Sequence, residues 1–177
     1  MRTYLEIKVP IKYDDPWFKE LRSLFADIPV RWQKDYYHIT MAFVNNTPKS
    51  IDMCQILKSH LTNVVAPELT FDLLDVFSTS SGYIFHLSAS RVPEAFLTLT
   101  ESIRADMIAA GCLIQSNFML HVTLGRLRDF NIRLPKLKRM IKTIPLSPFT
   151  LTLADVDYRE FRGSSIYETQ LPRNKAR

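Results

Sequence analysis

The sequence lacks several features that mark special classes of protein. It has no uninterrupted run of about 18 apolar residues, the length that a membrane-spanning helix requires. Residues 1–6 lack the long apolar segment of a secretory signal, so a cytoplasmic location is expected. The two cysteines, Cys54 and Cys112, form no Cys-x-x-Cys motif and no cluster with histidine. Neither a zinc site nor a disulfide framework is indicated.

The composition is that of one ordinary globular domain or of two small fused lobes. Of the 177 residues, 46% are hydrophobic and 23% are charged, which allows a sizeable buried core. The formal charge of +5 favours polyanionic partners such as RNA without establishing one. Part of that charge lies in residues 172–177, predicted to be a basic C-terminal tail, and part in residues 136–142. Both are explained more simply as solvated surface than as a nucleic-acid patch.

Apolar periodicity and the positions of proline and glycine predict the order of helices and strands. Strands are predicted at about 3–10, 30–33, 36–44, 69–77, 83–87, 118–127, 149–157 and 165–171, and helices at about 16–27, 51–61, 93–110 and 134–143. Strands joined by hairpins, with helices on their outer faces, predict an α+β protein with antiparallel sheets. The order of elements repeats in outline, which predicts two pseudo-symmetric lobes around a central cleft.

A short motif occurs twice, as His-Ile-Thr at 38–40 and as His-Val-Thr at 121–123. Alternate side chains of a strand lie on the same face, so His38 shares a face with Thr40, and His121 with Thr123. The two histidines are 121 − 38 = 83 residues apart, close to half the chain. The motifs therefore suggest two half-sites, one from each lobe, that meet in one cleft.

With these motifs the sequence resembles the 2H phosphoesterase superfamily, which includes RNA 2′,3′-cyclic phosphodiesterases and 2′-5′ RNA ligases. The flanking residues agree with the resemblance, namely Trp32 before the first motif, Arg126 five residues after the second histidine, and Tyr167 in the last strand. The resemblance covers about residues 3–171. It implies a two-lobed fold in which both motifs face a phosphate, and a monomeric phosphodiesterase that needs no metal ion or cofactor. It also implies that the first histidine donates a proton and the second activates water, an assignment that the residues alone leave open.

The chemistry agrees with the residues taken on their own. Opening a cyclic phosphodiester in water requires one group to take a proton from the attacking water and another to give a proton to the leaving ribose oxygen. Histidine suits both tasks, and each such transfer is typically worth ~10²- to 10⁴-fold in rate. The hydroxyl groups of Thr40 and Thr123 can hold the non-bridging oxygens of the phosphate.

Further candidates surround the motifs. Arg126 is a candidate phosphate ligand. It lies five residues after His121, an odd separation that puts it on the opposite face of a regular strand. It therefore reaches the histidine face only if the strand bulges or ends near Gly125. Candidates for stacking on a base are Trp32, Tyr36, Phe43, Tyr158 and Tyr167. Each of these aromatic residues is also compatible with a place in the core.

Two other histidines are weighed against the motifs. His86 begins a His-x-Ser sequence, but it lies 48 residues after His38 and 35 before His121, and it falls in a hairpin strand. A structural or surface role is predicted for it. His60 is expected to be a favourable charge near a helix C-terminus.

The substrate is left open among an RNA 2′,3′-cyclic terminus, a 2′-5′ linkage, a mononucleotide and a cyclic ADP-ribose phosphate. Many members of the superfamily follow the first motif with a Phe-Leu-Gly turn, whereas this sequence has Phe-Val-Asn-Asn at 43–46. The alternative to an enzyme is a non-catalytic nucleotide- or RNA-binding module on the same fold.

Overall fold

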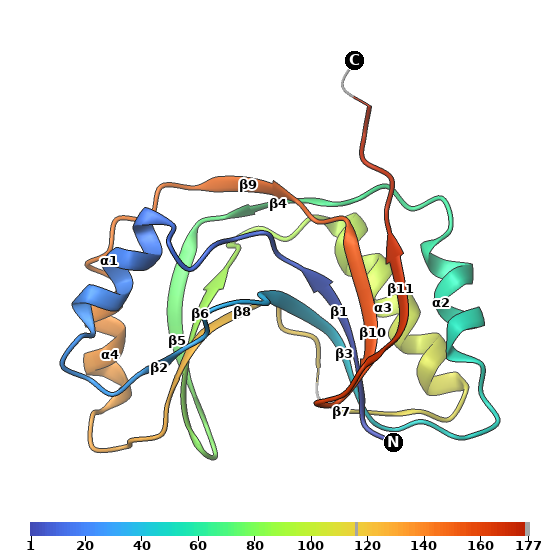
Figure 1. Cartoon of the computed structure of the whole chain (residues 1–177), viewed down its shortest axis with the longest axis horizontal. Helices are drawn as coiled ribbons and strands as arrows, with labels where there is room; N and C mark the ends of the chain where they lie inside the picture. The colour runs from blue at the N-terminus through green and yellow to red at the C-terminus, as the bar shows by residue number, and fades with distance from the viewer. Residues whose placement is uncertain (116, 176–177) are drawn as a thin grey trace.

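The computed structural model describes residues 1–115 and 117–175, so the last two residues of the predicted basic tail lie outside the described part. The strands form one large curved sheet and a separate two-stranded ribbon (Figure 1). The large sheet contains β1 (Thr3–Lys8), β2 (Arg31–Trp32), β3 (His38–Asn46), β5 (Leu73–Thr79), β6 (Gly82–Ser88), β7 (Leu113–Gln115), β8 (Val122–Leu127), β10 (Asp155–Glu160) and β11 (Ser165–Gln170). The ribbon pairs β4 (Glu68–Phe71) with β9 (Phe149–Thr152).

The order of strands across the sheet is β11-β10-β1-β3-β8-β6-β5, with β2 paired to β8 and β7 paired to β3. The pairs are antiparallel. The predicted α+β class with antiparallel sheets is therefore confirmed. The two motif strands, β3 and β8, are neighbours at the centre of this order, where the two halves of the sheet join.

The helices are α1 (Pro16–Leu24), α2 (Met53–Leu61), α3 (Glu94–Ala109) and α4 (Leu134–Ile141). They form two pairs, α1 with α4 beside the half of the sheet that contains β5, β6 and β8, and α2 with α3 beside the half that contains β1, β3 and β10 (Figure 1). Helix α1 thus follows β1 in sequence but packs on the other half. Each half of the sheet, with its pair of helices, is therefore built from both halves of the sequence.

Two predicted strands are broken in the structure. The stretch predicted at 69–77 divides at Asp72, whose carboxylate accepts hydrogen bonds from the backbone and hydroxyl of Ser90. The stretch predicted at 149–157 divides at Leu153, whose backbone N–H donates to the carbonyl of Pro67 at 2.8 Å. Both breaks let the first part of each stretch leave the large sheet and form the ribbon. In addition, the short strand β7 was not predicted. Within the described residues, no helix has the length and apolar character needed to cross a membrane.

Candidate active site

The two motifs lie side by side in the sheet. Strands β3 and β8 are antiparallel, with Ile39 opposite Val122. One step to either side, this register sets His38 opposite Thr123 and Thr40 opposite His121. Ile39 and Val122 are both 0% exposed, so the histidines and threonines share the face of the sheet away from the core. Diagonal neighbours on adjacent strands have Cβ atoms about 7–8 Å apart, and this register puts His38 and His121 at such diagonal positions.

Both histidine rings are oriented by the same backbone contact. Nδ1 of His38 lies 3.2 Å from the carbonyl oxygen of Tyr36, and Nδ1 of His121 lies 3.0 Å from that of Met119. A carbonyl oxygen only accepts hydrogen bonds, so Nδ1 carries the hydrogen in each ring. Nε2 is thereby left to exchange protons in each half-site.

A β-bulge follows the threonine in both motifs. On β3, Thr40 is opposite Glu6 and Ala42 is opposite Leu5, so Met41 is the extra residue. On β8, Thr123 is opposite His86 and Gly125 is opposite Phe85, so Leu124 is the extra residue. A bulge of one residue shifts the alternation of side chains by one. The fifth residue after each histidine therefore returns to the histidine face.

The residues that the bulges bring to the histidine face are Phe43 and Arg126. Arg126 could reach the histidine face only through a bulge or strand end near Gly125, and the bulge at Leu124 provides it. Gly125 faces the core, where a Cβ atom would lie 2.6 Å from Cε3 of Trp32 and 2.9 Å from Cγ1 of Val30. Only glycine leaves room for the Trp32 ring at this position.

Three of the predicted aromatic residues lie near the motifs. Phe43 packs against Tyr4, with ring centroids 4.7 Å apart. Tyr36 is 37% exposed, and its ring centroid is 5.5 Å from that of His38. Trp32 belongs mainly to an aromatic cluster with Phe18, Phe25 and Phe85 and also lines the cavity beside Thr123.

The other two predicted aromatic residues do not reach the histidine face, and the prediction of Tyr158 as a stacking residue is wrong because its ring is buried. Tyr158 is 1% exposed, and its hydroxyl accepts a hydrogen bond from the Thr3 hydroxyl at 2.9 Å. It is opposite Leu5, a core residue of β1. Tyr167 is in turn opposite Tyr158, so it lies on the same side of the sheet, packed against the core.

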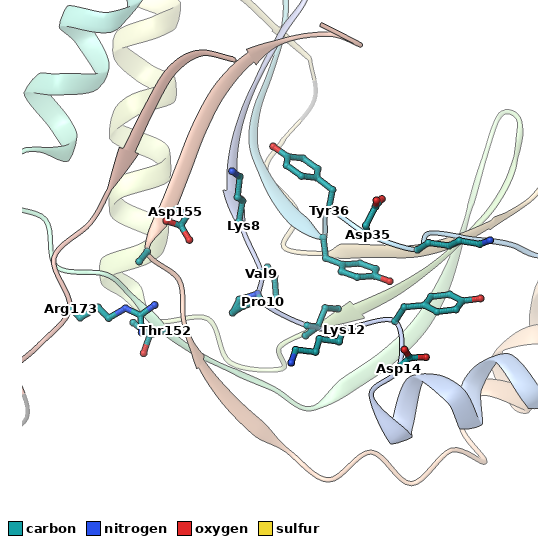
Figure 2. Close-up of a pocket in the computed structure, with 15 residues that line it drawn as sticks. Lys8, Val9, Pro10, Lys12, Asp14, Asp35, Tyr36, Thr152, Asp155 and Arg173 are labelled. Atoms are coloured by element: carbon teal, nitrogen blue, oxygen red, sulfur yellow. The ribbon is translucent and has the colours of Figure 1, made fainter. Parts of the chain in front are cut away.

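Two cavities lie close to the motif strands, and of the four histidine and threonine side chains of the motifs, Thr123 lines one of them. One of about 760 Å³ contains Thr123 in its lining and continues into a smaller one of about 290 Å³. Their cationic lining residues, here called the basic groove, are Arg31, Lys34, Arg126, Arg128 and Arg162. The second cavity, of about 570 Å³, is lined by Lys8, Lys12, Tyr36, Asp155 and Arg173 among others (Figure 2). Of these cations, sequence reasoning identified Arg126. The others come from strands and loops that meet only in the folded chain, so local periodicity gave no sign of them.

Two buried carboxylates next to His38 were also missed. Oε1 of Glu6 lies 3.2 Å from Nε2 of His38. Burial raises the pKa of Glu6, whereas the nearby His38 opposes that rise. Asp157 lies opposite Glu6 on β10 and is buried as well. Strand alternation in the sequence puts Glu6 on the face away from the core. Alternation does not show whether that face is covered by other residues or open to solvent, so the burial of Glu6 could not be predicted.

The surroundings of His121 differ in charge. Burial lowers the pKa of His121, and the nearby His38 and Arg126 lower it further, against a hydrogen bond to the carbonyl of Met119. These surroundings favour the neutral form of His121. His86 lies 6.0 Å from it between ring centroids, is only 7% exposed, and has its pKa lowered to about 4, first by burial and then by His121. His86 is thus a buried neighbour of the site. His60 pairs with Asp106 at 2.7 Å between α2 and α3.

Comparison with known proteins gives one family and several related folds. Residues 13–163 match the sequence model of a family described as the 2′-5′ RNA ligase superfamily. The crystal structure of E. coli LigT complexed with 3′-AMP superposes with a TM-score of 0.66 at 19% identity, covering 96% of this chain and 97% of that one. Usb1 from Kluyveromyces marxianus with uridine monophosphate gives a TM-score of 0.68 at 12% identity, covering 96% and 98%. No curated protein matches by sequence. At these identities the two structures show likeness in fold.

Proposed function

The chain belongs to the 2′-5′ RNA ligase superfamily, among the 2H phosphoesterases, and from this we propose that it hydrolyses the 2′,3′-cyclic phosphate of RNA ends by two-histidine acid-base catalysis, without a metal ion. The observation that carries the proposal is the antiparallel pairing of the two motifs around Ile39 and Val122. The pairing puts the two histidines at diagonal positions of neighbouring strands, each opposite a threonine, and we infer that a phosphate binds between them.

The geometry suits an in-line displacement. In the proposed step, Nε2 of one histidine takes a proton from water as the water oxygen bonds to phosphorus. The bond from phosphorus to a ribose oxygen breaks on the far side, and the second histidine protonates that oxygen. The hydroxyl groups of Thr40 and Thr123 donate to the non-bridging oxygens, on which negative charge grows. In the reverse direction, which forms a 2′-5′ bond or a cyclic phosphate, the two histidines exchange roles.

The charge around the cleft supports a phosphate ligand. Arg31 on β2 lies directly opposite Arg126 on β8. Like charges at directly opposite positions destabilise a pair of strands. A bound phosphate between the two arginines would offset that repulsion, and a planar guanidinium can hold two phosphate oxygens at once.

The basic groove supports an RNA end over a mononucleotide. It extends beyond Arg126 to Arg128 and Arg162, so cations are available for more than one phosphate. The two related structures contain 3′-AMP and uridine monophosphate, which are nucleotides of the kind that ends an RNA chain. We therefore expect a cyclic-ended oligonucleotide to be a better substrate than a cyclic mononucleotide.

The test is turnover of 2′,3′-cyclic nucleotides and of a 2′,3′-cyclic-ended oligonucleotide in EDTA. His38→Ala and His121→Ala should each lose about 10²- to 10⁴-fold in kcat, whereas His60→Ala, the control for an unrelated histidine, should keep the wild-type rate. Full activity in either motif variant would contradict the proposal. Tight nucleotide binding without turnover, unaffected by either motif variant, would instead establish the alternative of a binding module.

A further inference from the structure

Exposed cations continue along the chain after the second motif, beyond the basic groove. Strand β8 leads through residues 128–133 into α4 (Figure 1). Within residues 126–139 the exposed cations are Arg126, Arg128, Arg133, Lys136 and Arg139. The first two belong to the basic groove, so the other three extend its positive charge onto α4.

These three residues, here called the α4 cations, lie in one row on the helix. Arg133 is the N-cap of α4, and Lys136 and Arg139 follow at intervals of three residues. Side chains at this spacing are neighbours on a helix surface, and like charges there repel each other. Leu137 and Ile141 are buried and attach α4 to the core, whereas the α4 cations are exposed.

The α4 cations line a cavity of about 500 Å³ together with Asn131, Ile132 and Pro135. No described residue of this lining is acidic. Asp129, the acidic residue of the preceding loop, accepts a hydrogen bond from the backbone N–H of Asn131 at 2.8 Å. Among the ion pairs of residues 1–115 and 117–175, none involves an α4 cation. A row of like charges without a counter-charge from the chain favours an anionic ligand.

An exposed aromatic ring lies between the basic groove and the α4 cations. Phe130 is 53% exposed, and its ring contacts that of Tyr83, with centroids 5.3 Å apart. Tyr83 lines the smaller cavity of the basic groove, and Asn131, the next residue in the chain, lines the cavity of the α4 cations. Single exposed apolar residues are common on protein surfaces. An aromatic ring with cations on both sides, however, is the arrangement that binds single-stranded nucleic acid.

We propose that Phe130 and the α4 cations bind single-stranded RNA on the 5′ side of the reacting end. One base stacks on Phe130, and the phosphates to either side of it bind Arg128 and the α4 cations. The inference rests on the proposed function for the place of the RNA end, because a 2′,3′-cyclic phosphate leaves chain only on its 5′ side. It adds that the substrate is a single strand of several nucleotides, since the bases of a duplex are already stacked on one another.

Chain geometry limits the length of RNA that this surface can hold. Seven residues separate Arg126 from Arg133 (133 − 126), and an extended chain of that length spans at most about 25 Å. The row from Arg133 to Arg139 adds six residues at about 1.5 Å each, or about 9 Å. At about 3.4 Å per stacked nucleotide, the total corresponds to at most roughly ten nucleotides. Affinity should therefore rise with RNA length up to that limit and not beyond it.

A membrane surface is the other polyanion that a basic helix can bind. A helix that lies on a membrane needs a free apolar face beside its cations. On α4, the apolar residues Leu137 and Ile141 are buried in the core of the chain itself. This burial favours RNA, and anionic vesicles serve as the competing ligand in the test.

The test measures the binding of fluorescein-labelled single-stranded RNA with a 3′-phosphate, at lengths of two and ten nucleotides, by fluorescence anisotropy. Loss of a stacked base weakens binding by about 5- to 150-fold, so Phe130→Ala should raise Kd for the longer RNA by that factor. Phe130→Tyr retains a ring and should bind like wild type. Lys136→Gln combined with Arg139→Gln should reduce the slope of log Kd against log salt by about 1.4, since each phosphate contact contributes about 0.7. None of these changes should alter Kd for the shorter RNA.

Ile108→Ala and Lys58→Gln are the matched controls, because they remove an exposed apolar side chain and an exposed cation from the other pair of helices. Both should leave Kd unchanged for either RNA. A wild-type Kd that is the same at both lengths, or a Phe130→Ala variant that binds the longer RNA like wild type, would overturn the proposal. Binding to phosphatidylserine vesicles that is lost in Lys136→Gln with Arg139→Gln, while RNA affinity is unchanged, would assign the surface to a membrane instead.

The binding measurement requires no turnover, which separates this inference from the proposed function. A protein that binds the longer RNA through Phe130 but does not hydrolyse a 2′,3′-cyclic end refutes the proposed hydrolysis alone. A protein that hydrolyses cyclic ends, but binds and hydrolyses both lengths equally well, refutes the inference alone.

Discussion

Gly125→Ala tests whether the bulge after the second motif depends on contact between the β8 backbone and Trp32. The added Cβ would lie 2.6 Å from Cε3 of Trp32, where an ordinary contact is 3.4 Å or more. Trp32 has little freedom to move away, because the rings of Phe85, Phe18 and Phe25 surround it at 5.4, 5.9 and 6.3 Å. Overpacking of this kind costs about 1–3 kcal/mol.

For a domain of this size, that cost lowers Tm by roughly 2–12 °C, measured by circular dichroism. The same shift would move Arg126 relative to the phosphate, and a displacement of 1 Å can cost about 10²-fold in rate. We therefore expect kcat/KM for a cyclic substrate, assayed well below Tm, to fall toward that limit.

A double-mutant cycle with Trp32→Leu identifies the cause. If the Trp32 ring is what the added methyl group strikes, the smaller leucine side chain makes room for that group. The loss in the double variant should then be less than the sum of the single losses by about 1 kcal/mol or more. Additive losses, or a Gly125→Ala variant with the wild-type Tm and kcat/KM, would refute the account of the bulge.

Three further predictions follow from charge. The resemblance to the superfamily gives His121 the role of the base, which must be neutral to accept a proton, and the pKa of His121 is lowered. We therefore expect kcat/KM to persist below pH 6.5 and to decline only at lower pH; a decline centred above 6.5 contradicts this. His86 takes up a proton near pH 6.5 when unfolded but only near pH 4 when folded, so stability is lost as pH falls between these values. Between these pH values the free energy of unfolding, measured with urea, should fall by roughly 3 kcal/mol less in His86→Gln than in wild type. An equal pH dependence in the two proteins would count against this prediction. Arg128→Ala and Arg162→Ala should lower kcat/KM for a cyclic-ended oligonucleotide more than for a cyclic mononucleotide, and should flatten its salt dependence; equal losses on both substrates would argue against the basic groove.

The relation of the histidine to the threonine within each motif could be predicted from the sequence, because it depends on local alternation alone. A histidine and a threonine two residues apart share a face wherever the chain is extended. The sequence predicts a bulge or strand end near Gly125 only on the condition that Arg126 reaches the histidine face, because Arg126 lies an odd number of residues after His121. The matching bulge at Met41 had no such indicator, because Phe43 is an apolar residue that is compatible with either face.

The surroundings of the motifs depended on contacts between distant parts of the chain. Tyr158 and Phe43 are both aromatic residues in strands, yet register sets one against the core and the other beside the histidines. Glu6 and Asp157 are 151 residues apart and meet only because β10 pairs with β1. Local periodicity contains no information on such pairings, so the buried carboxylates could not have been found without the fold.

The likeness of the two half-sites ends where the reaction requires a difference. Hydrolysis needs one histidine that holds a proton and one that lacks it, so a fully symmetric site would spend part of its time with both rings in the same state. The shared features, namely the motif, the carbonyl contact to Nδ1 and the bulge, fix where the rings and hydroxyl groups lie. The unlike features are the neighbours, Glu6 against His86 and Phe43 against Arg126. The two half-sites thus share the features that fix where the rings and hydroxyl groups lie, and they differ in the residues that set the charge beside each ring.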